Sequence, residues 1–285
     1  MPVSSSLKMM EWNLHFQSKK AEIADFVKDR VKSQDVAIFT EIVKSASVLA
    51  LMNELNEFNF YESCNTEGNQ IIIAVRRNIK VSRVISKIPN VAIYNAPNLL
   101  HVEIMIDGIK YQIIGVRIRI DDGSEEDYRD RNKQFDYLAN YLSDLENIIV
   151  SGDFNNSYIR GDLSENYSNV KKLYEKNYKG ELLCTRFFNY HMMKEMLGEN
   201  VNVFTPEDKY SWGLKYKDGE FDYGYIRNDH LIASKTIIVE KYDYDWNFVC
   251  ENEDTYKVMK LRKDGIMEVA AGYPDHAVLY VEIRI

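Results

Sequence analysis

The sequence is poor in cysteine, and the three that it has, Cys64, Cys184 and Cys250, lie far apart. An odd number of widely spaced cysteines offers neither a paired disulfide framework nor the Cys-x-x-Cys spacing of a zinc site. We therefore expect all three to be reduced and to be buried as small side chains.

Long apolar runs are also missing, because the longest, such as Ile71 to Val75, are far shorter than the roughly 20 residues that cross a bilayer. With 45% hydrophobic and 28% charged residues, the composition excludes the membrane and the disordered classes. The start, Met1-Pro-Val-Ser-Ser-Ser, lacks the basic and apolar regions of a secretory signal, so we expect a cytoplasmic protein.

Neither a linker rich in Gly, Ser or Pro nor an internal repeat interrupts the chain, and its five prolines are widely spread. We therefore expect one domain spanning residues 1–285, and no obligate protein partner is evident. Basic residues are not in excess, since 36 Lys and Arg against 44 Asp and Glu give a net charge of −8. A polyanionic substrate would have to be met by a local basic patch or by a metal ion.

Short β-branched runs recur from end to end and predict at least eight strands. They are Leu7 to Leu14, Val36 to Phe39, Ile71 to Val75, Leu100 to Ile106, Tyr111 to Ile120, Ile148 to Ser151, Leu231 to Ser234 and Ala277 to Ile285. The last run alternates apolar and polar residues, as a half-buried antiparallel strand does.

Apolar residues at helical spacing predict helices between these strands. Ile23, Phe26, Val27 and Val31 form one stripe, Phe135, Leu138, Leu142 and Leu145 form another, and further helices are expected over Val43 to Leu55 and Phe187 to Leu197. This pattern favours a four-layered α/β (α+β) sandwich, with two packed, mainly antiparallel sheets flanked by helices. The aperiodic stretch Asn156 to Glu181 is either a functional loop or a solvated insertion.

The segment Ile148-Ile-Val-Ser-Gly-Asp-Phe-Asn-Asn156 is an apolar strand that runs into Asp153 and Asn155. Residues two apart at a strand end lie on the same side, so these two side chains can converge on one polar object. Alone, the segment is equally typical of a turn in which Asp and Asn bond their own backbone.

Four other segments add polar groups at strand boundaries, in a set order along the chain. They are Met9-Met-Glu-Trp-Asn13, Ala37-Ile-Phe-Thr-Glu41, Asn228-Asp-His-Leu-Ile-Ala-Ser234 and Tyr273-Pro-Asp-His-Ala-Val278. With these five motifs in this order, the sequence resembles the endonuclease/exonuclease/phosphatase superfamily, which has a deoxyribonuclease I-like fold. The resemblance runs from Met9 to Val278 and implies metal-dependent hydrolysis of phosphate esters.

The resemblance implies a Mg²⁺ (or Mn²⁺) cofactor, and such hard ions prefer oxygen ligands. Glu41 is the first expected metal ligand, Asn13 is expected on the metal or on a phosphate oxygen, and Asp275 is a further candidate ligand. The other interpretation of Glu41 is a partner in a surface ion pair.

The resemblance also assigns catalytic roles. Asp153 would orient or deprotonate the attacking water, and Asn155 would hydrogen-bond the phosphate. Asp275 would hold His276 in one tautomer, and His276 would contact the scissile phosphate. Asp229 would be an orienting carboxylate or a second metal ligand, with Asp222 as a rival for that role.

Three departures from the family pattern stand out. Arg117 follows the strand Gln112-Ile-Ile-Gly-Val116 where many members have a His; it is either a clamp on the substrate phosphate or a strand-surface charge. Pro274 replaces the usual Ser, and Ala277-Val278 stands where a Pro often follows. Arg131 and Gln134 are expected to be structural or to position the substrate, and we interpret His15, His101 and His191 as structural.

The sequence thus predicts a Mg²⁺-dependent phosphodiesterase, an endonuclease or exonuclease that cleaves DNA or RNA through in-line attack of a metal-activated water. The alternative is a phosphatase or phospholipid phosphodiesterase, of the inositol-phosphate or sphingomyelinase type, because the shared motifs report phosphate chemistry and not the attached group. A third hypothesis, a binding module with a dead site, is disfavoured by the intact Glu41, Asp153, Asn155, Asp275 and His276.

Overall fold

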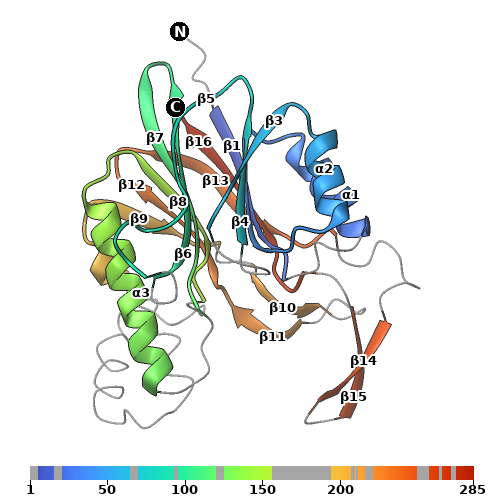
Figure 1. Ribbon diagram of the computed structural model, residues 1–285. Coiled ribbons are helices and arrows are strands. Elements are labelled where there is room, and N and C mark those ends of the chain that lie inside the picture. The colour runs from blue at the N-terminus through green and yellow to red at the C-terminus, as the bar shows by residue number, and fades with distance from the viewer. Residues whose placement is uncertain are drawn as a thin grey trace.

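The computed structural model of the protein describes residues 6–15, 21–64, 70–92, 96–119, 125–155, 194–206, 209, 211–215, 221–248, 257–262, 265–270 and 274–285. The described strands form two six-stranded sheets and two short two-stranded sheets. The two large sheets pack face to face, with helices on both outer sides (Figure 1). The predicted four-layered α/β sandwich of two packed sheets flanked by helices is confirmed.

The first large sheet has the strand order β13-β16-β1-β2-β4-β3. Its strands are β1 (Ser6–Asn13), β2 (Val36–Ile42), β3 (Phe58–Glu62), β4 (Gln70–Arg76), β13 (Ile238–Asp245) and β16 (Val278–Arg284). Only β1 and β2 are parallel, joined through α1 (Ala21–Val31), and the other neighbours are antiparallel. Together with α2 (Ala46–Glu54), α1 lies on the outer face of this sheet (Figure 1).

The second large sheet has the order β5-β6-β7-β8-β12-β9. Its strands are β5 (Lys80–Ile85), β6 (Asn98–Ile106), β7 (Ile109–Arg117), β8 (Ile148–Asp153), β9 (Val201–Phe204) and β12 (Asp229–Ser234). Again one neighbouring pair is parallel, β7 and β8, joined through α3 (Glu125–Ser143), which covers the outer face. Each sheet therefore has one parallel pair of strands at its centre.

Residues that alternate along a strand divide between two hydrophobic cores. On β7, Ile113 packs into the core between the sheets, whereas Ile114 packs under α3 with Phe135 and Leu138. This alternation follows from the two-residue period of a strand, and it explains why the central strands are apolar on both faces. The described part of the chain contains no helix long and apolar enough to cross a membrane.

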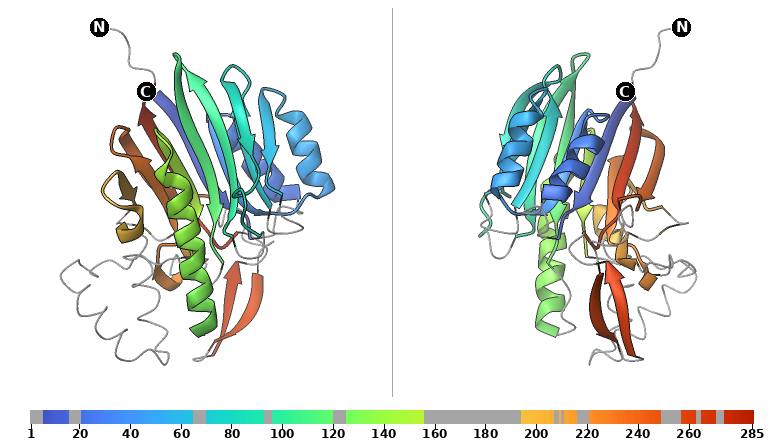
Figure 2. Two further views of the ribbon diagram at one scale, coloured as in Figure 1. Left: turned by 60° about the vertical axis from the view of Figure 1, so that its left-hand side comes forward. Right: turned by 90° about the vertical axis from the view of Figure 1, so that its right-hand side faces the viewer.

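Two short hairpins complete the structure: β10 (Trp212–Lys215) with β11 (Phe221–Ile226), and β14 (Lys257–Arg262) with β15 (Gly265–Ala270). Both lie at the end of the sandwich away from the two chain termini, and the β14–β15 hairpin projects from it (Figures 1 and 2).

All eight predicted strands and the two striped helices are confirmed, and α2 lies within the helix expected over Val43 to Leu55. The helix predicted over Phe187 to Leu197 lies mostly outside the described residues, although 194–197 are helical. The stretch Asn156 to Glu181 lies wholly outside them. The expected burial of cysteine is wrong for Cys64, which is free and exposed, and the other two cysteines are not among the described residues.

Gly152 places the end of β8 against its neighbour β7. A Cβ atom at this position would lie 1.9 Å from the backbone oxygen of Val116, the residue paired with Gly152 in the parallel register. No side chain fits there, because a backbone atom cannot move aside as a flexible side chain can.

We predict that Gly152→Ala lowers the free energy of unfolding by more than about 4 kcal/mol, or prevents folding altogether, because β8 has to separate from β7. Gly108→Ala is the matched control: Gly108 has a φ of +83° but nothing within 4 Å of its added Cβ, so the substitution costs only the left-handed backbone strain of about 1–2 kcal/mol. Chemical denaturation of both variants checks this, and equal losses would contradict it.

Candidate active site

Four polar residues lie at the carboxyl ends of the four strands that form the two parallel pairs, β1 with β2 and β7 with β8. Asn13 ends β1, Arg117 ends β7 and Asp153 ends β8, while Glu41 is the next-to-last residue of β2. Parallel neighbours have their carboxyl ends at the same edge of a sheet. Two contacts then join the sheets: Asn13 Nδ2 donates to Asp153 Oδ2 at 2.9 Å, and Arg117 donates to Glu41. The predicted convergence of these strand ends is therefore present in the structure.

The carboxylate of Asp153 is buried and accepts three hydrogen bonds. Besides Asn13, the backbone N–H of Asn155 donates to Oδ1 at 2.8 Å, and Asn155 Nδ2 donates to Oδ2 at 3.0 Å. Burial raises the pKa of Asp153 to about 7, because the imidazole of His276 lowers it only in part and the charge of Asp229 raises it further. A carboxylate of this kind can exchange a proton near neutral pH.

Asn155 has a left-handed backbone, with a φ of 48°, which Asn tolerates better than most residues. Its Nδ2 donates to the Ile118 carbonyl at 2.7 Å as well as to Asp153, so both of its side-chain protons are used. In this structure Asn155 positions Asp153, and its expected hydrogen bond to phosphate stays a prediction.

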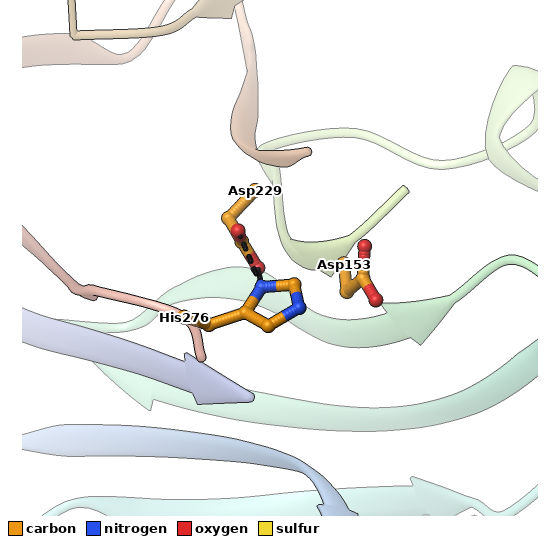
Figure 3. A group of neighbouring side chains, drawn as sticks. All are labelled: Asp153, Asp229 and His276. Carbon is orange, nitrogen blue, oxygen red and sulfur yellow. Dashed lines mark hydrogen bonds and ion pairs between the residues drawn. The ribbon is translucent and has the colours of Figure 1, made fainter. Parts of the chain in front are cut away.

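His276 is paired with Asp229. Its Nδ1 lies 2.8 Å from Asp229 Oδ2 and 3.1 Å from Oδ1, and the imidazole lies between Asp229 and Asp153 (Figure 3). Burial by itself lowers the pKa of His276, but the negative charge and hydrogen bond of Asp229 outweigh it and hold the pKa well above its ordinary value. The raised pKa favours the imidazolium, whose Nδ1–H donates to the Asp229 carboxylate.

The structure corrects the expected partner of His276. The resemblance implied that role for Asp275, but Asp275 Oδ1 is 4.0 Å from His276 Nε2, beyond hydrogen-bond distance. Asp229 instead faces Nδ1, the other ring nitrogen, at 2.8 Å. The expectation of Asp229 as an orienting carboxylate is the one that the contact supports. Side chains around the rival, Asp222, are not described.

The backbone around this pair is fixed from several sides. Asp229 pairs with Asp153 in the register of β12 and β8. Ser211 Oγ accepts from the backbone N–H of Asp229 at 3.1 Å, and the Tyr244 hydroxyl donates to the Asp229 carbonyl. Trp12 Nε1 donates to the His276 carbonyl at 3.0 Å. Trp12, the aromatic residue before Asn13, thus holds the backbone of His276, just before β16, near the end of β1.

Glu41 is ion-paired with Arg117 through a single oxygen. Arg117 Nε and Nη2 both lie 2.6 Å from Glu41 Oε1, and the Arg117 side chain is only 15% exposed. The interpretations of Glu41 and of Arg117 as surface charges are therefore wrong. Burial raises the pKa of Glu41, but His15 and the Arg117 guanidinium outweigh it and lower the pKa to about 2. Glu41 is an anion throughout the neutral range.

Asp275 has one oxygen with a donor and one without. Trp212 Nε1 donates to Oδ2 at 3.1 Å, while Oδ1 is buried and accepts no hydrogen bond from any described residue. A buried carboxylate oxygen without a donor is costly unless a cation meets it. Glu41 and Asp275 thus supply carboxyl oxygen ligands of the kind that a hard divalent cation prefers, and the residues fit such an ion.

Asp153, Asp229 and His276 form another group that could hold a metal ion, since one ligand atom of each lies within 4.8 Å of the others. The His276 Nδ1 is already hydrogen-bonded to both oxygens of Asp229, and the Asp153 carboxylate already accepts three hydrogen bonds. We therefore interpret this group as acid–base machinery. Asn13 uses its amide on Asp153 and accepts from the His15 backbone N–H at 2.8 Å, so its metal contact stays a prediction.

Two site residues escaped the sequence analysis. His15, interpreted as structural, lies beside Glu41 and Asp275; the only signal for it was its place two residues after Asn13. Glu11 is a buried carboxyl whose Oε1 accepts from Thr40, and burial, with the nearby charge of Asp229, holds its pKa well above the ordinary value. A charged residue within an apolar strand, two before Asn13, was the available signal.

Arg131 and Gln134 on α3 form hydrogen bonds with backbone groups around the site. Arg131 is buried and donates to the Asn155 carbonyl, while Gln134 accepts from the Arg119 backbone and donates to the Ala96 carbonyl. The expected structural role agrees with these contacts. His101 lies on β6 and bonds to Gln112 and Tyr141 instead of to any site residue; His191 is outside the described residues.

No protein-family model matches the sequence, and the comparison with curated proteins found no match. Solved structures nevertheless share its fold. TDP2 of D. rerio, complexed with a single-strand DNA product, has a TM-score of 0.65 and 15% identity, covering 99% of this chain and 100% of that one. An endonuclease/exonuclease/phosphatase family protein from Bacteroides thetaiotaomicron has a TM-score of 0.56 and 12% identity, covering 99% and 98%.

A mannosyl-6-phosphatase from Bacteroides thetaiotaomicron has a TM-score of 0.57 and 11% identity, covering 98% of this chain and 100% of that one. At these identities the likeness establishes the fold. The chain has the deoxyribonuclease I-like fold of the endonuclease/exonuclease/phosphatase superfamily.

Exchanging Asp229 for Asn should lower the pKa of His276, because the charge that stabilises the imidazolium is removed. Titration of the His276 ring followed by NMR measures this shift. Asp275→Asn is the control and should move the pKa less, since Asp275 makes no hydrogen bond to the ring. A larger shift in the Asp275 variant would show that the two carboxylates have been assigned the wrong way round.

Proposed function

We propose that the protein is a metal-dependent phosphodiesterase of this superfamily that hydrolyses phosphodiester bonds in nucleic acid. One observation carries the proposal: three side chains with suitable pKa values meet at one site. The pKa of Asp153 is about 7, the pKa of His276 is raised, and the pKa of Glu41 is lowered to about 2. Hydrolysis of a phosphate ester needs a proton acceptor for water and positive charge at the phosphate, and these groups supply both.

Asp153 accepts the proton of the attacking water as its oxygen bonds to phosphorus. Asn13 and Asn155 hold the carboxylate in position through their side-chain N–H groups. His276 donates from Nε2 to a phosphate oxygen as charge builds there, because its Nδ1 is engaged by Asp229. The bond from phosphorus to the leaving oxygen then breaks, and solvent protonates that oxygen. No covalent enzyme intermediate is required.

A divalent cation held by Glu41 and Asp275 would neutralise phosphate charge during this reaction. Arg117 provides a second positive charge next to Glu41. Its guanidinium can donate to phosphate in pairs while staying charged, as expected of a clamp. The ion is Mg²⁺ or Mn²⁺ in this proposal.

A nucleic acid substrate is supported by the similar structure of D. rerio TDP2, which is described in complex with a single-strand DNA product. A phosphatase is the second candidate, because another protein of the same fold is described as a mannosyl-6-phosphatase. The catalytic groups serve both reactions, so the substrate has to be decided by experiment.

The test is a panel of plasmid DNA, single-stranded DNA, RNA, a sugar phosphate and inositol phosphates, each incubated with Mg²⁺, with Mn²⁺ and with chelator. We expect ion-dependent strand scission. Release of inorganic phosphate without scission would replace the proposal with the phosphatase, and hydrolysis unaffected by the chelator would reject the metal requirement.

Asp153→Ala and His276→Ala should each lower kcat/KM by several orders of magnitude, because each side chain acts mainly in the transition state. His101→Gln serves as the control, since His101 lies outside the site. Steady-state kinetics, with circular dichroism to verify folding, measures the effect. Near-normal turnover in either alanine variant would remove that residue from the mechanism.

The pH dependence of kcat/KM follows from the two pKa shifts. Asp153 has to be ionised to accept a proton, so activity should rise about tenfold per pH unit up to the pKa of about 7 and then level off. His276 has to be protonated, and its raised pKa places the fall in activity at higher pH. Asp229→Asn should move the alkaline limb to lower pH, and the acid limb in the same direction, because the Asp229 charge raises the pKa of both groups. An unchanged alkaline limb would argue against His276 as the donor.

A further inference from the structure

His15 lies where two carboxylates from different strand boundaries meet. Its Nδ1 is 3.3 Å from Asp275 Oδ1 and 3.6 Å from Glu41 Oε2. The imidazole is 46% exposed, whereas the Asp275 and Glu41 side chains are 13% and 6% exposed. Two largely buried anionic side chains thus point at one nitrogen of a ring that solvent can reach.

In both carboxylates, the oxygen that does not face His15 already accepts a hydrogen bond from another side chain. Glu41 Oε1 accepts from Arg117, and Asp275 Oδ2 accepts from Trp212. Donors in these positions fix the orientation of a carboxylate and leave its other oxygen for an ion. The two oxygens left over are the ones that face His15.

The separations suit an ion among the three side chains. An octahedral ion with bonds of about 2.1 Å holds adjacent ligand atoms about 3 Å apart, and the two distances from His15 Nδ1 are slightly longer. The hydrogen bond to Glu41, with the charges of both carboxylates, outweighs burial and raises the pKa of His15, so a cation bound at Nδ1 takes the place of the proton there. His15 is also held in place, since its backbone N–H donates to Asn13 Oδ1 and its φ is 43°.

We propose that His15 is a third protein ligand of the divalent cation, together with Glu41 and Asp275. This deepens the proposed function, on which it rests, by naming the class of metal. Mg²⁺ favours oxygen ligands alone, whereas imidazole suits first-row transition ions. A site of two carboxylates and one imidazole therefore binds Mn²⁺ in preference to Mg²⁺.

Mn²⁺ alone is the probe, and pulsed electron paramagnetic resonance of the complex detects a directly bound ¹⁴N nucleus. We expect the nitrogen coupling in the wild-type protein and its loss in His15→Asn, since Asn accepts the left-handed backbone but has no imidazole. His276→Gln is the matched control, because it removes the other imidazole near Asp275; the coupling should persist there.

Titration of Mn²⁺ by the loss of its free signal gives the affinity. His15→Gly, which also tolerates a positive φ, should bind Mn²⁺ at least about tenfold more weakly, since loss of a ligand costs no less than loss of a group that orients one. Competition with Mg²⁺ should show a preference for Mn²⁺ in the wild type that shrinks in His15→Asn.

Mn²⁺ bound without nitrogen coupling, or with a coupling that only His276→Gln removes, overturns the role of His15. Absence of Mn²⁺ binding overturns it as well. The substrate panel separates this from failure of the proposed function: ion-dependent hydrolysis with no nitrogen ligand leaves the phosphodiesterase standing and removes only His15 from its metal site.

Discussion

The buried carboxylate of Asp153, enclosed where the two sheets meet, is the constraint on which the site depends. Removing an anion from water is expensive unless it is hydrogen-bonded on several sides. The chain meets this cost with Asn13 from the opposite sheet and with two donors from Asn155. Because one of these donors crosses between the sheets, the site can form only when both sheets have packed.

The same burial produces the chemistry. It raises the pKa of Asp153 toward neutrality, and the negative charge of Asp229 keeps His276 protonated nearby. Both groups ordinarily have pKa values below neutral pH. Raising both lets Asp153 exchange a proton near pH 7 while His276 favours its protonated form at the same pH. Three of the six described non-glycine residues with positive φ, His15, Glu41 and Asn155, belong to the site, where such conformations are often found.

The central strands could be predicted because they are buried on both faces and form continuous apolar runs. All four edge strands, β3, β5, β9 and β13, were missed for the opposite reason. β5 and β13 are mostly exposed, and their polar residues hide the two-residue period. Edge strands are held by hydrogen bonds to one neighbour, which leave little pattern in the sequence.

By itself the sequence determined the layered fold and the strand ends that carry Asn13, Glu41, Asp153 and the Asp-His pairs, because strand periodicity and residue order are local properties. Only the tertiary structure decided which groups meet. It pairs His276 with Asp229, joins Arg117 to Glu41 and brings His15 between two carboxylates. These contacts span long stretches of chain, and they depend on how two twisted sheets pack and on which nitrogen or oxygen each rotamer presents, neither of which a short motif contains.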